Sequence, residues 1–207
     1  FAQSADVMYL CHPNHDVRKL SRTGHTSWTL ATVSFSGSPS LPISGSDNRP
    51  SCVSFFEQRL VFANTNNNPQ TLWFSKSGDY ENFTTGTNAD DAMIYTIASN
   101  QVNAIQYLKA VRTLIVGTSG GEFTVSADGT DASITPTNET IKRQSSFGSA
   151  GVDAIPAGKA VLFLQKAKRK IRELAYNFDS DGYVAPDLTI LNDTVTKSGI
   201  NQMAYQQ

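Results

Sequence analysis

The string Gly117-Thr118-Ser119-Gly120-Gly121 has the G-x-S-x-G spacing of a hydrolase nucleophile elbow. In such an elbow a strand runs into the serine and a helix follows it, so that the serine hydroxyl is exposed at a sharp turn. The residues that follow here, Glu122-Phe123-Thr124-Val125-Ser126, have strand character instead. We therefore interpret the string as a tight hairpin turn whose glycines supply positive φ, and not as a catalytic site.

A second string resembles a calcium loop. Asn177-Phe178-Asp179-Ser180-Asp181-Gly182 follows the first half of the pattern D-x-[DN]-x-[DN]-G. The twelfth position of that pattern, which should supply a bidentate Glu, is Leu188. We interpret the string as a turn rich in Asn and Asp between structural units, and we expect no cofactor.

Three histidines, His12, His15 and His25, lie close in sequence to Cys11. A zinc site needs four ligands held in a tetrahedron. Because adjacent residues of a strand point to opposite faces, Cys11 and His12 are poorly placed to share a metal ion. We expect surface histidines, and we expect Cys11 and Cys52 to be reduced and buried thiols.

One basic cluster stands out, formed by Lys166, Lys168, Arg169, Lys170 and Arg172. Lysines at a solvated hairpin tip discourage edge-to-edge pairing of strands, which is one interpretation. The other is contact with an acidic neighbouring subunit or with DNA phosphates. No aromatic residue lies within the cluster, so stacking on single-stranded bases is not indicated.

The acidic residues do not suggest an enzyme. Asp90, Asp91 and Glu139 lie in stretches typical of loops, where nothing fixes the separation that glycoside hydrolysis requires. No nucleophile, base and orienting group can be named together, and we expect no catalytic activity.

The composition favours a fold of many short strands. Only 17% of the 207 residues are charged, 39% are hydrophobic, and the formal net charge is −1. Proteins whose main task is to grip phosphates usually have a clear basic excess, which is missing here. No run of about 18 apolar residues exists, so the sequence predicts no membrane span.

The elements that would position all these residues repeat along the chain at intervals of about 50 residues. Four apolar runs with strand character begin at Val7, Leu60, Leu114 and Val161. A short polar turn follows each run and leads to a second strand-like run, and these begin at residues 17, 71, 122 and 170. Each repeat is therefore expected to contain an antiparallel hairpin, and almost no helix is expected.

A further strand precedes three of the hairpins, at 52–56, 102–107 and 152–155, and another follows two of them, at 27–32 and 140–143. Four antiparallel strands in each repeat are the pattern of a β-propeller blade. We predict an all-β protein, a β-propeller-like array of four-stranded antiparallel blades that is part of a larger propeller. A β-sandwich with fortuitous spacing is the alternative.

The predicted blades are 1–50, 51–100, 101–150 and 151–199, with 200–207 as the start of the next blade. Residues 1–10 would begin at the second strand of a blade, and residues 200–205 would form an innermost strand. We therefore expect the chain to be a fragment or the ordered part of a longer protein.

Several segments also resemble one protein family. They include V53-S-F-F-E-Q-R-L-V-F-A63, P69-Q-T-L-W-F-S-K-S-G-D-Y-E-N-F83, L114-I-V-G-T-S-G-G-E122 and S180-D-G-Y-V-A-P-D-L-T189. These strings, together with Asp90-Asp91 and residues 97–105, are similar to a tail protein of tailed bacteriophages, of the tail tubular or nozzle type found in short-tailed phages. The resemblance covers nearly the whole chain. Its motifs indicate the strands of the fold more than any mechanism.

The resemblance implies a structural virion protein, made in the host cytoplasm and assembled into the phage tail. It implies a homo-oligomeric ring, expected to be sixfold, below the portal and adaptor, which prolongs the DNA channel and docks fibres or spikes. Contact with genomic DNA would be transient and non-specific, in keeping with the small net charge.

A different class of function is a β-propeller recognition module that binds a host-surface glycan or a partner protein. It would need exposed aromatic residues gathered on one face, and Trp28, Tyr80, Phe83 and Tyr183 are the candidates. Ordinary packing within blades would explain the same residues. A third hypothesis, a propeller enzyme acting on polysaccharide, would need paired carboxylates that the sequence does not reveal.

Overall fold

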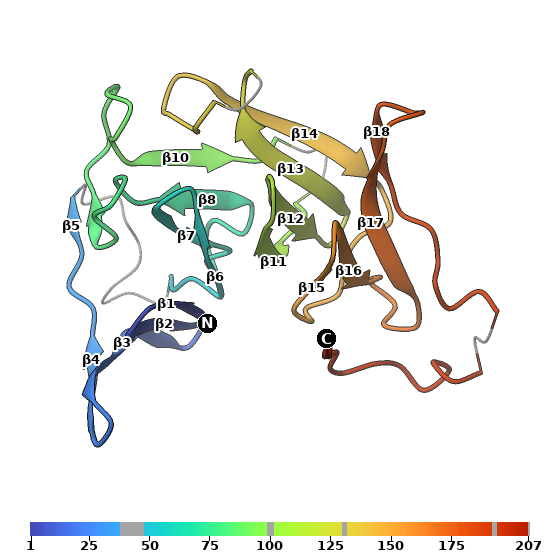
Figure 1. Cartoon of the computed structure of the whole chain (residues 1–207), viewed down its shortest axis with the longest axis horizontal. Helices are drawn as coiled ribbons and strands as arrows, with labels where there is room; N and C mark the ends of the chain where they lie inside the picture. Colours follow the sequence, from blue (N-terminus) through green and yellow to red (C-terminus); the bar gives the residue numbers. More distant parts are fainter. Residues whose placement is uncertain (38–47, 99–101, 130–131, 192–193, 207) are drawn as a thin grey trace. The chain divides into compact units, whose positions relative to one another are not determined.

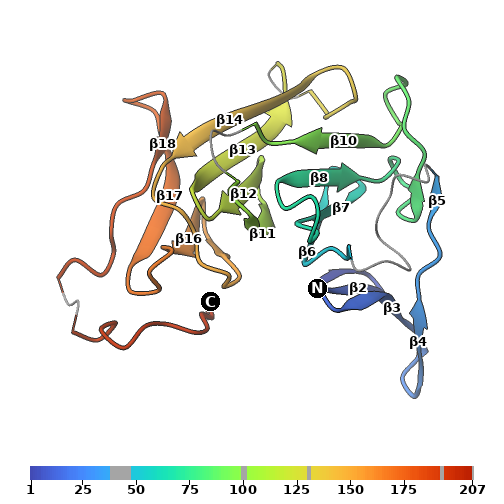
Figure 2. The same ribbon diagram turned by 180° about the vertical axis from the view of Figure 1, so that it is seen from behind.

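The computed structural model describes residues 1–37, 48–98, 102–129, 132–191 and 194–206 (Figure 1; from behind, Figure 2). Over these ranges the chain forms strands, turns and coil without any helix, which confirms the prediction of an all-β fold. In the same residues no helix is long and apolar enough to cross a membrane.

Most strands belong to four antiparallel sheets of four strands each. The first sheet has the order β1 (Ala2–Ser4), β2 (Val7–His12), β3 (His15–Gly24) and β4 (Ser27–Thr32). The second has the order β10 (Met93–Thr96), β8 (Thr71–Phe74), β7 (Arg59–Ala63) and β6 (Cys52–Phe56). A parallel pair, β5 (Ser36–Gly37) and β9 (Asn82–Phe83), lies outside them.

The other two sheets follow the chain order. The third consists of β11 (Ile105–Ala110), β12 (Leu114–Thr118), β13 (Gly121–Ala127) and β14 (Glu139–Ser145). The fourth consists of β15 (Ile155–Ala157), β16 (Ala160–Leu164), β17 (Ile171–Asn177) and β18 (Gly182–Val184). The prediction of four-stranded antiparallel sheets is thus confirmed, while their closure into a propeller stays a prediction.

The chain divides into two compact units. One contains residues 1–102 and 126–140, and the other contains residues 103–125 and 141–207. In the first unit, Tyr9 and Val17 of the first sheet pack against Leu60, Phe62 and Trp73 of the second. The cluster also takes in Val33, Phe83 and Ala92.

The second unit has a core of the same kind. Tyr107 and Ile115 of the third sheet pack against Val161, Phe163 and Leu174 of the fourth. In both units, therefore, two neighbouring sheets bury their facing sides against each other.

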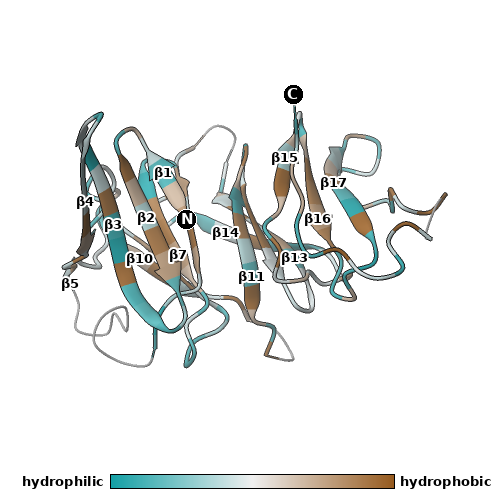
Figure 3. Ribbon diagram, turned by 90° about the horizontal axis from the view of Figure 1, so that it is seen from below, coloured by the Kyte–Doolittle hydropathy of each residue, from teal (hydrophilic) through white to brown (hydrophobic). Residues whose placement is uncertain are grey.

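The central strands explain why these sheets need partners on their faces. Every residue of β7 and β12 is buried, and apart from Arg59 and Thr118 none has a polar side chain, as expected for strands covered on both faces. Figure 3 shows β7 and β16 largely in the hydrophobic colour, whereas β3 is mostly hydrophilic. A sheet built around strands of the β7 type cannot be stable alone, because both of its faces would expose apolar area to water.

The prediction from the sequence placed some strands wrongly. The chain does not begin at the second strand of a sheet, because Ala2–Ser4 forms a short first strand that pairs with β2. β11 and β15 begin at Ile105 and Ile155, later than predicted. Residues 200–205 form no strand. Instead Ile200 and Met203 pack against Leu164 in a small cluster, so apolar burial replaces the strand pairing expected there.

One buried charge fixes the longest loop of the second sheet. Arg59 is 2% exposed, and its guanidinium donates hydrogen bonds to the carbonyl oxygens of Ser75 (2.8 Å), Ala89 (2.6 Å) and Asp91 (2.7 Å). Burial lowers the pKa of Arg59. Because the guanidinium offers five donors in a rigid fork, a single side chain can hold segments 75–76 and 89–91 together.

We predict that Arg59→Ala lowers the free energy of unfolding by about 2–4 kcal/mol, since it leaves several buried carbonyl groups without donors. The matched control is Arg169→Ala, at an exposed position, where a change within about 0.5 kcal/mol is expected. Urea unfolding followed by tryptophan fluorescence measures both. Equal stabilities of the two variants would contradict the proposed bracing role of Arg59.

Candidate functional site

The basic cluster occupies the turn between β16 and β17. Lys166, Lys168 and Arg169 are all exposed there. The backbone of the turn is fixed, because Lys168 has a positive φ of 60° and its carbonyl oxygen accepts a hydrogen bond from the amide of Ile200 at 2.8 Å. The turn therefore presents three exposed cations on an anchored backbone.

The other two members of the cluster are engaged within the fourth sheet. The Arg172 guanidinium lies 3.4 Å from the centroid of the Phe147 ring. It also donates to the Gln165 side chain (2.9 Å) and to the Ala185 carbonyl (2.7 Å). These are packing contacts, and they leave Arg172 much less available to a partner than the three turn residues.

Lys170 forms an ion pair with Asp187, with 3.1 Å between Nζ and Oδ2. Hydrogen bonds from Thr189, together with Lys170, lower the pKa of Asp187 to about 2. The structure thus separates the predicted cluster into three free-standing cations, Lys166, Lys168 and Arg169, and two cations that brace the sheet.

A carboxyl group that sequence reasoning did not single out lies buried in the third sheet. Glu122 is 0% exposed. Its oxygens accept hydrogen bonds from the hydroxyl groups of Ser145 and Ser149, the latter at 2.8 Å. Burial raises the pKa of Glu122, and the hydrogen bonds oppose that rise. The hydroxyl donors replace the water that the carboxyl group loses on folding.

Next to Glu122, a large aromatic side chain lies directly across from a glycine. Tyr107 pairs with Gly117 in the register of β11 and β12. A Cβ atom at Gly117 would lie 2.2 Å from the Tyr107 ring, so only glycine fits. Burial raises the pKa of the Tyr107 hydroxyl group well above its usual value.

The G-x-S-x-G string is confirmed as a hairpin turn, since Ser119 and Gly120 join β12 directly to β13. The expected reason for its glycines is wrong, because neither Gly120 nor Gly121 has positive φ. Added Cβ atoms would lie 2.4 Å from the Asn103 side chain and 2.6 Å from the Ser145 carbonyl oxygen, respectively. Close approach of neighbouring segments, and not backbone conformation, requires glycine here.

The calcium-like string is a turn, as predicted. The Asn177 side chain accepts hydrogen bonds from the amides of Asp179 (2.8 Å) and Ser180 (3.2 Å), as in an Asx turn. The turn joins β17 to β18 inside the fourth sheet, however, and does not connect two sheets as expected.

The remaining polar candidates do not gather into a site. His12, His15 and His25 are exposed as predicted. Cys11 and Cys52 are free thiols, and Cys52 is buried as predicted whereas Cys11 is only half-buried. Burial raises the pKa of Cys11 to about 12. Among the residues that the structure describes, no three His, Cys, Asp or Glu side chains are placed to hold a metal ion.

The acidic residues of the loops have structural partners. Asp91 lies 2.9 Å from Lys76, and burial, followed by the nearby Glu139, raises the pKa of the Tyr95 hydroxyl group well above its usual value. Of the four aromatic candidates, Phe83 is buried, while Tyr80 and Tyr183 pack against the cores of their units. Only Trp28 is exposed.

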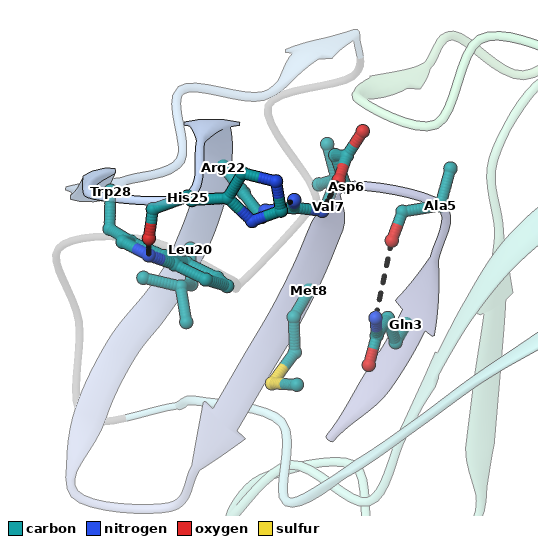
Figure 4. A pocket seen from close by; sticks show the side chains of 9 residues that line it. All are labelled: Gln3, Ala5, Asp6, Val7, Met8, Leu20, Arg22, His25 and Trp28. Atoms are coloured by element: carbon teal, nitrogen blue, oxygen red, sulfur yellow. Dashed lines mark hydrogen bonds and ion pairs between the residues drawn. The ribbon is translucent and has the colours of Figure 1, made fainter.

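Trp28 borders an open hollow of about 390 Å³ on the first sheet (Figure 4). Its indole Nε1 donates to the His25 carbonyl oxygen at 3.2 Å, and the Arg22 guanidinium lies 5.9 Å from the ring centroid. Arg22 in turn forms an ion pair with Asp6 at 3.0 Å. The rest of the lining is supplied by Gln3, Ala5, Val7, Met8 and Leu20.

Sequence reasoning missed this surface because its apolar residues come from separate strands and only the register brings them together. The same holds for Glu122, whose serine partners lie more than 20 residues away. No protein-family model matches the chain, and a search of curated proteins finds no match either.

We predict that the isolated chain binds duplex DNA weakly, through the turn between β16 and β17. The plot of log K against log salt concentration should have a slope of about −0.9 for each phosphate neutralised. The double variant Lys168→Ala/Arg169→Ala should therefore make the slope less negative by about 2. Fluorescence anisotropy of a labelled duplex over a salt series measures the slope.

The control is Lys142→Ala/Lys159→Ala, which removes the same charge from exposed positions elsewhere in the same unit. An identical change in slope in both double variants would show that the turn has no special role and that only net charge matters.

We also predict that Glu122 makes the fold less stable as the pH rises. A carboxyl group whose pKa is raised in the folded state holds its proton while the unfolded chain has already lost it. The stabilisation is complete below the ordinary pKa of 4.5 and is lost as the pH rises towards the folded-state pKa. In Glu122→Gln this loss should disappear.

Free energies of unfolding of the wild type and of Glu122→Gln, measured from pH 4 to pH 7, test this expectation. The difference between them should shift in favour of the variant as the pH rises. Glu173→Gln, at a half-buried position of the fourth sheet, serves as control. A difference that stays constant with pH would refute the assignment.

Proposed function

We propose that this chain is a structural virion protein, a β-propeller-like part of the tail nozzle or tube through which a bacteriophage conducts its DNA. The observation that carries the proposal is the series of four-stranded antiparallel sheets with apolar faces, packed in pairs within each unit. Such repeated units suit the wall of a large assembly, because each added sheet covers its neighbour.

The resemblance to phage tail proteins gains support from where its segments lie. Residues 53–63 form the β6–β7 hairpin, and residues 114–122 cover β12 and the turn into β13. Each of these segments contains a strand in which every residue is buried, β7 in the first unit and β12 in the second. The shared motifs thus coincide with the residues that specify the sheets.

The buried polar groups favour a structural role over a catalytic one. Arg59 is bonded to backbone carbonyl groups, and Glu122 to serine hydroxyl groups. Both groups are enclosed by the fold and are not aimed into an open cavity, as a catalytic acid or base would be.

Modest charge is compatible with a wall past which DNA slides. The net charge is −1, and the candidate DNA contact is the turn that carries the exposed Lys166, Lys168 and Arg169. Three phosphate contacts would be broken easily at physiological salt concentrations. In the proposed assembly the chain forms a homo-oligomeric ring between the portal and adaptor on one side and fibres or spikes on the other.

A recognition module is the second candidate, favoured by one observation. Trp28 is 56% exposed beside the charged groups of Arg22 and Asp6. An exposed indole ring next to hydrogen-bonding groups could pack against the apolar face of a sugar ring while those groups bind its hydroxyls.

The deciding experiment is cryo-electron microscopy of particles from the host in which the chain is naturally made, combined with labelling by an antibody raised against the purified chain. We expect label at the tail end of the particle and a ring of four-stranded sheets around an axial channel. Absence of the chain from purified particles would overturn the virion proposal. Trp28-dependent binding on a glycan array would then support the second candidate.

A further inference from the structure

The two sheet pairs use corresponding faces. In the apolar run of β7, the first and third residues, Leu60 and Phe62, face the preceding sheet. In the run of β16 the first and third residues, Val161 and Phe163, do the same. In each pair, the earlier sheet covers the later one with the face that is turned toward it. In the first unit this is the face that carries Tyr9.

The face of the first sheet opposite Tyr9 is also apolar. Met8, Leu20 and Leu30 lie directly across from one another on β2, β3 and β4, so their side chains form a row on that face. Leu30 is 55% exposed and Trp28 is 56% exposed. This row and the hollow beside Trp28, seen in Figure 4, make up what we call the leading face.

The fourth sheet also has an apolar face, on the side that points away from the core that it shares with the third sheet. Ile155 pairs with Leu162, Ala157 with Ala160, and Ala175 with the partly exposed Val184. Ile200 and Met203 cover one end of this face, near Leu164. The remainder, which we call the trailing face, carries small side chains around Leu162.

We propose that the leading face of one chain docks on the trailing face of a second copy of the same chain. Within each unit, one face of the earlier sheet covers a face of the later sheet. The proposed contact would repeat that arrangement between two chains. This docking proposal rests on the proposed function in one respect, that it treats the chain as a unit whose sheets stack on those of other copies.

The two faces complement each other in shape and charge. The leading face has bulky residues in a row, Met8, Leu20 and Leu30, and the trailing face has alanines into which such a row can pack. Arg18 is exposed on the leading face, and Glu173 lies beside Leu162 on the trailing face. Their opposite charges would set the register of the contact.

Because the two faces differ, the contact is head-to-tail and can continue into a closed ring or an open filament. Stable interfaces bury about 1,200–2,000 Å² in total, and the proposed sheet-on-sheet contact would need to reach that area. A self-pairing contact, leading face on leading face, would instead stop at a dimer.

The test uses one blocked variant for each face. Leu30→Glu blocks the leading face and Ala175→Glu blocks the trailing face, and light scattering after gel filtration gives the mass at about 1–100 µM chain. We expect the wild type to form oligomers and each variant to be monomeric. An equimolar mixture of the two variants should form a one-to-one dimer and nothing larger, because each has one intact face.

Controls keep the outcome interpretable. Leu191→Glu, in a residue 96% exposed outside the sheets, should oligomerise like the wild type, and circular dichroism should show that every variant is folded. If Ala175→Glu fails to fold, Val184→Glu replaces it, because Val184 is 38% exposed on the same face.

A monomeric wild type, an oligomeric Leu30→Glu variant, or a mixture that stays monomeric would each overturn the proposal. A dimer of Ala175→Glu alone would establish self-pairing of leading faces instead. These results do not depend on whether the chain occurs in phage particles, so the docking and the virion function can fail separately.

Discussion

The structure depends above all on one constraint, that the central strands of its sheets carry apolar side chains that need to be covered. β7 and β12 have no residue in contact with water, so a cover on one face alone would leave several large side chains exposed. Burying such a side chain contributes about 1.5–3 kcal/mol, and a sheet of this kind is therefore stabilised by packing against the neighbouring sheet of its unit. The pairing of sheets within each unit follows directly from this requirement.

Buried polar groups fix the positions of loops relative to their sheets, which apolar packing alone leaves undetermined. Arg59 ties loop carbonyl groups to the second sheet, and Glu122 ties β14 and the segment after it to the third sheet through Ser145 and Ser149. Hydrogen bonds of this type require defined geometry, whereas apolar faces can slide. In each unit, a buried ionisable side chain therefore holds a returning segment of the chain against its sheet.

The repeat was visible in the sequence because the central strands are short apolar runs bounded by turn residues, as in residues 60–63 and 161–164. The edge strands were harder to predict. Ala2–Ser4 is too short and too polar to give a pattern, and Ile200 lies in an apolar stretch that packs as coil. Contacts between distant segments, such as Glu122 with Ser149, cannot be inferred from composition or spacing. The basic turn was predicted as a cluster, but only the structure shows that Arg172 stacks on Phe147.

The two accessible surfaces differ in the kind of contact that they can make. An apolar face gains from the release of water and is little affected by salt, which suits permanent assembly. Three cations on a turn would bind phosphates only through electrostatic attraction that salt weakens, and such binding would suit a partner that must move past. A protein whose subunits must hold together while DNA slides along them needs these two properties on separate surfaces. Here the apolar face belongs to β1–β4, and the basic turn lies between β16 and β17, in different units of the chain.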